Sequence, residues 1–146
     1  MTRVNRSPVR LNVKEKSMKL SILALLVAGV LPVVCAGIAK AGFHRYDNRD
    51  PRAWLARQTG FRARANAAQA NSFEAFPFFA SGVLLALLAK VDPGLIDGLA
   101  VAFMLARLAY IGCYLANQAS LRTLVWTLGY GCVIALHVLA LRAGVA

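Results

Sequence analysis

Residues 64–77 have the sequence RANAAQANSFEAFP, which opens a hydrophobic stretch long enough to cross a lipid bilayer. Within it lie a guanidinium (Arg64), a carboxylate (Glu74) and three side-chain amides. A charged side chain in a membrane span costs at least ~2.5–3.5 kcal/mol on insertion scales, so it normally faces a partner or a water-filled cavity. The stretch therefore predicts a membrane helix that carries part of a functional site.

The composition indicates a small integral membrane protein. Of the 146 residues, 59% are hydrophobic and only 16% are charged, and the mean hydropathy is +0.58. These values exclude an ordinary soluble domain, and the length suits a single membrane domain. The net charge of +11 comes from residues that flank the apolar runs, as charges at a membrane surface do. We therefore do not expect nucleic acid as a partner.

Four apolar segments each approach the ~20 residues that a membrane-spanning helix requires. They are residues 20–39, 65–89, 95–116 and 124–141. None shows the two-residue alternation typical of strands in a membrane barrel. Asp92-Pro93-Gly94 is a turn signal that joins the second and third segments as a hairpin. The sequence thus predicts an all-α membrane protein with a four-transmembrane-helix bundle.

The connector between the first two segments, residues 42–62, is long and basic. Its run Asp47-Asn48-Arg49-Asp50-Pro51 is expected to start a turn. Residues 53–58 are then expected to add a short interfacial helix anchored by Trp54.

Residues 1–17 form a basic tail that we separate from the membrane domain, residues 18–146. The first apolar run exceeds the 7–15 residues of a signal-peptide core, which favours an uncleaved span. The side of the membrane with the first and third connectors carries eight basic residues, against three on the other side without the tail and eight with it. Because cytoplasmic loops are rich in Lys and Arg, either Met18 is the true start or the tail is a translocated or membrane-surface arm. With Met18 as the start, both termini lie outside and the basic connector is cytoplasmic, in what we expect to be a bacterial inner membrane.

One face of the second helix carries most of its polar residues. At 100° per residue, Arg64, Asn71 and Glu74 lie within about 80° of one another. Ala67 lies on the same face but carries no polar group. Gln69 projects from another side of the helix. The plainer alternative to a site is that Asn71 and Glu74 hold neighbouring helices together.

The third helix repeats this pattern. Arg107, Tyr110 and Tyr114 have the spacing i, i+3, i+7 and therefore line one face. Arg107 is expected to form an ion pair with Glu74, because pairing lowers the cost of placing both charges in a membrane. This ion pair could belong to a ligand site or be purely structural. An adjoining stripe of small residues is expected to form a tight packing face. It consists of Ala102, Ala106, Ala109, Cys113 and Ala116.

Arg122 opens the fourth segment, where an arginine is usually an interfacial anchor. Successive spans alternate in direction, so the polar ends of helices two, three and four meet at one membrane face. The residues expected to converge there are Arg64, Asn71, Glu74, Tyr110, Tyr114 and Arg122. They suit a small anionic ligand with an amino group, because Glu74 can take an ammonium and the arginines can take carboxylates. An arginine beside a thiol also stabilises the nucleophilic thiolate.

No metal site is expected. Cys35, Cys113 and Cys132 lie apart in apolar runs, and His44 and His137 have no partner at metal-ligand spacing.

Two motifs resemble the MAPEG family, the membrane-associated proteins in eicosanoid and glutathione metabolism. The run Ala-Gln69-Ala-Asn71-x-x-Glu74-x-Phe-Pro77 is similar to the family's second-helix signature. The third-to-fourth-helix stretch of the family is matched by Ala106-Arg107-Leu-x-Tyr110-x-x-x-Tyr114 followed by Leu121-Arg122. The run Arg122-Thr-Leu-Val-Trp126-x-x-Gly129 resembles the bacterial branch. The resemblance covers roughly residues 20–142.

The resemblance implies a four-helix bundle that forms a homotrimer. It also implies that glutathione binds between subunits near the cytoplasmic face. Carried over by position, Asn71 and Glu74 hold the glutathione backbone, and Gln69 contacts it from the neighbouring subunit.

The remaining matched positions include one departure from the family pattern. Those that line the implied pocket are Arg107, Tyr110 and Tyr114. Arg122 matches the arginine assigned to thiolate activation in some members. Ala67 stands where glutathione-using members typically carry an arginine, and Arg64 is the expected substitute one turn earlier.

We therefore expect a glutathione-dependent transferase or peroxidase acting on a lipophilic electrophile that enters from the bilayer. Glutathione is the expected co-substrate, and the expected partners are membrane lipids, a lipophilic substrate and further copies of the chain. The first alternative is a non-catalytic trimer that binds a lipid or another small anionic ligand in the same pocket. The second is a structural membrane protein with buried ion pairs.

Overall fold

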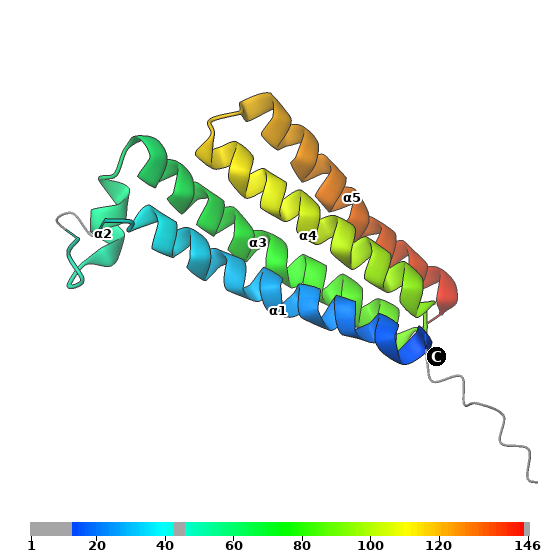
Figure 1. Ribbon diagram of the computed structural model, residues 1–146. Coiled ribbons are helices and arrows are strands. Elements are labelled where there is room, and N and C mark those ends of the chain that lie inside the picture. Colours follow the sequence, from blue (N-terminus) through cyan, green and yellow to red (C-terminus); the bar gives the residue numbers. More distant parts are fainter. Residues whose placement is uncertain (1–12, 43–45, 145–146) are drawn as a thin grey trace, which may run out of the picture.

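The fold is a bundle of four long helices with one short helix at its end (Figure 1). The computed structural model describes residues 13–42 and 46–144. In chain order the helices are α1 (Val13–Ala39), α2 (Pro51–Ala56), α3 (Gly60–Leu88), α4 (Pro93–Leu115) and α5 (Ala119–Ala143). The predicted tail falls largely outside the described residues, as does His44.

The four long helices are long and apolar enough to cross a membrane, which confirms the predicted four-helix architecture. The first candidate span, Leu20–Ala39, agrees with the predicted one at both ends. The helices α3 and α5 each begin five residues before the predicted starts, at Gly60 and Ala119. Polar residues fill those first turns, so hydropathy alone does not reveal that they are helical.

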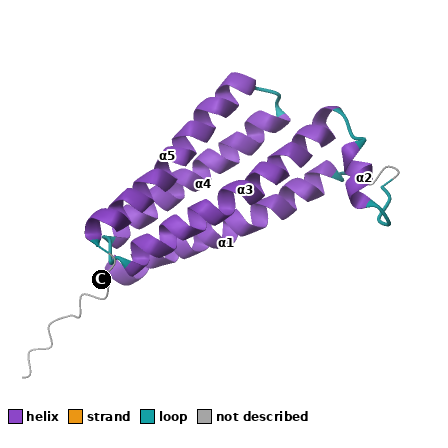
Figure 2. Cartoon of the chain, turned by 180° about the vertical axis from the view of Figure 1, so that it is seen from behind, coloured by secondary structure: helices purple, strands orange, loops and turns teal. Residues whose placement is uncertain are grey.

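Packing places α3 and α4 at the centre of the bundle's contacts. The helix α1 packs against α3 and α4, and α5 packs against α4 and α3 (Figure 2). Ring stacking joins α3 to α4, where the Phe79 and Phe103 centroids lie 4.0 Å apart. Much of the interior is alanine, as in Ala68, Ala86 and Ala100, because small side chains let helices approach closely in lipid. Large apolar side chains lie outside, with Leu141 78% exposed, as a lipid-facing surface requires.

Only part of the small-residue stripe on α4 packs against other helices of the same chain. Ala102, Ala109 and Ala116 are exposed in the chain. Only Ala106 and Cys113 turn inward, and a Cβ added at Gly129 of α5 would lie 3.3 Å from that of Ala106. Within one chain, the larger residues of α4, including Phe103 and Ile111, fill the core instead.

The turns between spans follow from helix-capping chemistry. The Oδ1 atom of Asp92 accepts hydrogen bonds from the backbone N–H groups of Gly94 and Leu95 at 3.0 and 3.2 Å. Two residues after the ends of α3 and α4 the backbone is left-handed, with φ of 55° at Lys90 and 59° at Asn117. This conformation lets the next N–H reach back to an unpaired helix carbonyl. The predicted hairpin at Asp92 is therefore confirmed.

The short helix α2 holds the long connector against the bundle. The Oδ1 atom of Asp50 caps it by accepting the N–H of Ala53 at 3.1 Å. Trp54 is only 5% exposed and meets Tyr46 edge to face, with ring centroids 5.2 Å apart. The predicted short helix forms two residues earlier than expected, and Trp54 anchors it from inside the protein.

A buried carboxylate joins α1 to α4 at the opposite end of the bundle. Asp97 is 5% exposed, and its Oδ1 atom accepts the backbone N–H of Ser21 at 2.9 Å. Its Oδ2 atom is buried without a hydrogen-bond partner among the described residues. The sequence gives no sign of this contact, because it joins residues 76 positions apart.

Candidate functional site

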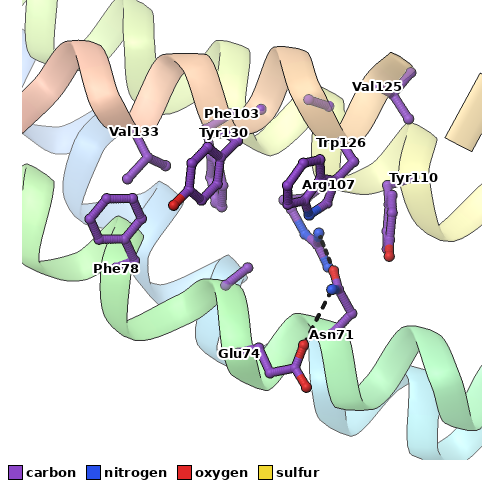
Figure 3. A pocket seen from close by; sticks show the side chains of 13 residues that line it. Asn71, Glu74, Phe78, Phe103, Arg107, Tyr110, Val125, Trp126, Tyr130 and Val133 are labelled. Atoms are coloured by element: carbon purple, nitrogen blue, oxygen red, sulfur yellow. Dashed lines mark hydrogen bonds between the residues drawn. The ribbon is translucent and has the colours of Figure 1, made fainter. Parts of the chain in front are cut away.

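A crevice with a volume of about 140 Å³ lies between α3, α4 and α5 (Figure 3). The helix α3 contributes Asn71, Glu74, Ala75 and Phe78, and α4 contributes Phe103, Ala106, Arg107 and Tyr110. The helix α5 contributes Val125, Trp126, Gly129, Tyr130 and Val133. Four predicted site residues, Asn71, Glu74, Arg107 and Tyr110, therefore line one cavity within a single chain.

The polar end of this crevice is organised by Arg107, which is 5% exposed. Its Nη1 atom donates to Oδ1 of Asn71 and its Nη2 atom donates to Oγ of Ser72, both at 2.9 Å. The Nδ2 group of Asn71 in turn donates to Oε2 of Glu74 at 3.4 Å. The three side chains thus form a chain of hydrogen bonds with Asn71 in the middle (Figure 3).

The predicted ion pair between Arg107 and Glu74 is not formed. Asn71 lies between these two described residues and separates the charges. Glu74 lies on the exposed side of α3, and the guanidinium reaches across the helix interface to the buried hydroxyl of Ser72. The buried cation is therefore held by neutral acceptors, and the Glu74 carboxylate keeps most of its hydrogen-bonding capacity for another group.

A series of aromatic and cationic contacts leads from the crevice to Arg122. The guanidinium carbon of Arg107 lies 4.4 Å from the ring centroid of Tyr110, which meets Tyr114 edge to face at 5.1 Å. The guanidinium carbon of Arg122 lies 4.4 Å from the Tyr114 ring centroid. Cations gain from contact with the negative face of an aromatic ring. Tyr114 and Arg122 thus lie beside the polar end, although neither lines the crevice itself.

Two further predicted site residues, Arg64 and Gln69, also lie outside the crevice. The Nε and Nη2 groups of Arg64 donate to the carbonyl oxygen of Leu115 at 3.3 and 3.2 Å, so the side chain caps the end of α4. Arg64 therefore does not fill the place that Ala67 leaves empty on α3. Gln69 is half-buried, and its Oε1 atom is covered without a hydrogen-bond partner among the described residues.

Aromatic walls make up the rest of the crevice, and most of them are absent from the site that the sequence predicts. Trp126 stacks on Tyr130 with centroids 5.1 Å apart, and Tyr130 meets Phe78 at 5.4 Å. Phe78 also stacks on His137 at 4.5 Å. The spacing of Trp126, Tyr130 and His137 (i, i+4, i+11) places them along one face of α5, which is the signal that could have found them.

His137 has a structural place at the far end of this wall. One ring nitrogen, Nδ1, lies 2.9 Å from the carbonyl oxygen of Val133, and the other, Nε2, lies 3.2 Å from Oγ of Ser81. A Cβ added at Gly82 would lie 2.9 Å from the imidazole ring, so glycine makes room for it. No group of three potential metal ligands occurs in the part of the chain that the structure describes.

The arrangement suits an amphiphilic ligand. An amide, a carboxylate, a phenol and a guanidinium lie at one end of the crevice, and aromatic rings with small and aliphatic residues form the remainder. Ligand sites commonly combine a largely apolar lining with a few polar groups that set orientation.

The sequence matches the model of the MAPEG family over residues 20–142, which covers nearly all of the four membrane-spanning segments and every residue of the crevice. No curated protein matched the sequence. The chain is therefore an integral, multi-pass membrane protein that belongs to the MAPEG family.

Proposed function

We propose that this protein is a glutathione-dependent transferase or peroxidase that acts on lipophilic electrophiles. The observation that supports this proposal is that one crevice has both a polar end and aromatic walls, and that these walls open toward the lipid-facing surface. A peptide thiol and a lipid-soluble acceptor need these two environments side by side. Family membership makes glutathione the first thiol to test.

The polar groups divide the recognition of glutathione between them. Glu74 offers its carboxylate to the ammonium group, and Asn71 and Tyr110 offer hydrogen bonds to the peptide and its carboxylates. Arg107 is engaged with Asn71 and Ser72, so it orients Asn71 and supplies positive potential. Arg122 is half-exposed beside Tyr114, and we assign it to the sulfur.

The proposed chemistry is attack by a thiolate. The positive charge of Arg122 favours loss of the thiol proton to water and stabilises the remaining sulfur anion. In the transferase reaction the sulfur lone pair forms a bond to the electrophilic carbon, and the leaving group departs with its bonding electrons. In the peroxidase reaction the thiolate attacks the terminal oxygen of a lipid hydroperoxide, the O–O bond breaks, and the alkoxide takes a proton from water and leaves as the alcohol. A second glutathione thiol then attacks the sulfur of the sulfenic acid, which gives glutathione disulfide and water.

The proposal is tested by measuring conjugation of a lipophilic electrophile by purified protein with glutathione. We expect Arg122→Ala to lower kcat/KM by about 100-fold or more, because one electrostatic donor at a reacting centre commonly contributes that much. The matched control is Arg142→Ala, which removes an exposed arginine at the opposite end of the bundle and should leave the rate unchanged. Absence of activity with any thiol would overturn the proposal.

The second candidate is a non-catalytic member of the same family that binds a lipid or another small anion in this crevice. Two observations favour it, since Ala67 removes a cation from the polar face and the guanidinium of Arg64 is already bound to Leu115. The lost contact corresponds to ~1.5–3 kcal/mol per hydrogen bond to a charged group.

Titration calorimetry with glutathione, comparing the wild type with Ala67→Arg, separates the two candidates. Binding by the wild type supports the first candidate, and we expect a further gain of about tenfold or more in the variant. Binding by Ala67→Arg alone favours the second. Ala63→Arg, placed one turn earlier, is the control for added charge.

A homotrimer in a bacterial inner membrane, with the basic connector in the cytoplasm, is part of the same proposal. Its support is family membership and the excess of basic residues in the first connector.

A further inference from the structure

We propose that one end of the bundle binds anionic phospholipid headgroups of the membrane that surrounds it. This surface, the connector end, comprises the segment between α1 and α3 together with the turn between α4 and α5 (Figure 1). Its described basic residues are Lys40, Arg49, Arg52, Arg57, Arg62, Arg64 and Arg122. Arg122 also belongs to the proposed thiol chemistry, so the inference is tested on Arg52 and Arg57, which lie outside the crevice and have no part in that chemistry.

The basic residues of the connector end lack carboxylate partners within the described chain. The two acidic residues here, Asp47 and Asp50, accept the backbone N–H groups of Arg49 and Ala53 at 2.8 and 3.1 Å. They therefore stabilise the turn before α2 and form no ion pair with the arginines. Among the described residues Arg52 and Arg57 are exposed, and neither side chain has a hydrogen-bond partner. Their charges are free for an external anion.

The connector holds these charges at the level of the helix ends. Trp54 is buried, and its carbonyl oxygen accepts a hydrogen bond from Nε2 of Gln58 at 2.9 Å. The Nη2 group of Arg62 donates to the carbonyl oxygen of Ala41 at 2.9 Å, which ties the end of α1 to the start of α3. The connector therefore lies against the bundle, so Arg52 and Arg57 stay close to where the spans leave the bilayer.

The described part of the opposite end has a smaller excess of positive charge. Its basic residues are Lys14, Lys16, Lys19, Lys90 and Arg142, and its acidic residues are Glu15, Asp92 and Asp97. Among the described residues, the connector end therefore has the larger net positive charge. Anionic headgroups fit this surface best, because arginine binds phosphate through paired hydrogen bonds and the headgroups already lie at this depth.

The test compares association of the protein with phosphatidylglycerol and with phosphatidylcholine. The protein is reconstituted in mixed bilayers, and the relative association constant of each spin-labelled lipid is measured. We expect a preference for phosphatidylglycerol that falls by at least about fivefold in Arg52→Gln/Arg57→Gln, since each basic residue near an anionic surface contributes about that factor. Raising the salt concentration should reduce the preference of the wild type.

The matched control is Lys90→Gln/Arg142→Gln, which removes the same two charges from the opposite end. This control should keep the preference of the wild type, and thermal unfolding should show that both variants are folded. Equal loss in both variants, or no preference in the wild type, would overturn the proposal. A different result would also overturn the proposal. In it, the protein in neutral detergent binds an oligonucleotide through Arg52 and Arg57, while the double variant keeps the lipid preference of the wild type.

Discussion

Arg107 is buried without a carboxylate partner, so its hydrogen bonds to Asn71 and Ser72 replace the water that the guanidinium loses. Replacing Asn71 by leucine leaves one buried N–H group without an acceptor. We expect Asn71→Leu to lower the free energy of unfolding by ~1.5–3 kcal/mol. Thermal unfolding in detergent, followed by circular dichroism, measures the change. Asn66→Leu is the control, because Asn66 is half-buried on the same helix and has no hydrogen-bond partner among the described residues. An equal loss of unfolding free energy in the two variants would contradict this role of Asn71.

The same network shows where sequence reasoning about single residues ends. Helical spacing alone predicts that Asn71 and Glu74 share a face, and both line the crevice. Spacing does not give the rotation of α4 against α3, and that rotation decides whether Arg107 reaches Glu74 or Asn71. The same rotation turns Arg107 toward the hydroxyl of Ser72. Nothing in the sequence marks this serine as a site residue.

A hydrogen bond joins α1 to α4, because Asp97 accepts the backbone N–H of Ser21. We expect Asp97→Ala to lower the free energy of unfolding by ~1.5–3 kcal/mol, the contribution of a hydrogen bond to a charged group. Asp97→Asn should stay close to the wild type, because the amide retains an acceptor oxygen and removes a buried charge. Amide hydrogen exchange reports the effect locally, since the Ser21 amide should exchange faster in the alanine variant. Equal exchange in the alanine and asparagine variants would argue against a hydrogen bond from this amide to residue 97.

Helices are predictable here to the extent that lipid dictates their composition. The four spans follow from hydropathy, because a membrane helix must be apolar over about 20 residues. The first turns of α3 and α5 are polar and lie outside that constraint, so their starts are missed by five residues. The turn at Asp92 is local and therefore predictable. The contact between Asp97 and Ser21 joins two distant segments and is not.

The whole chain leaves a polar group that a single copy in lipid does not satisfy. Glu74 is exposed on a membrane-spanning helix, and its carboxylate has one hydrogen bond, at 3.4 Å, among the described residues. Exposure of such a group to lipid is costly, so it normally faces a partner. A neighbouring copy covering this side of α3 would provide that partner. This is the physical support for the homotrimer inferred from family membership, and native mass spectrometry should give three times the 15.7 kDa of one chain.

Mixed oligomers test whether Gln69 serves the crevice of a neighbouring copy. Gln69→Ala and Arg122→Ala chains are prepared separately, shown to be poorly active in conjugation, and then co-expressed. If Gln69 acts on the crevice of a neighbouring copy, a complete site needs a chain with intact Arg122 beside a neighbour with intact Gln69. Random mixing of the two variants in a closed ring produces this arrangement at about one quarter of the positions. Activity should therefore rise well above the average of the two single variants. If Gln69 acts within its own chain, no complete site forms and activity stays at that average. Such a result, or a monomeric wild type, would contradict an intersubunit site.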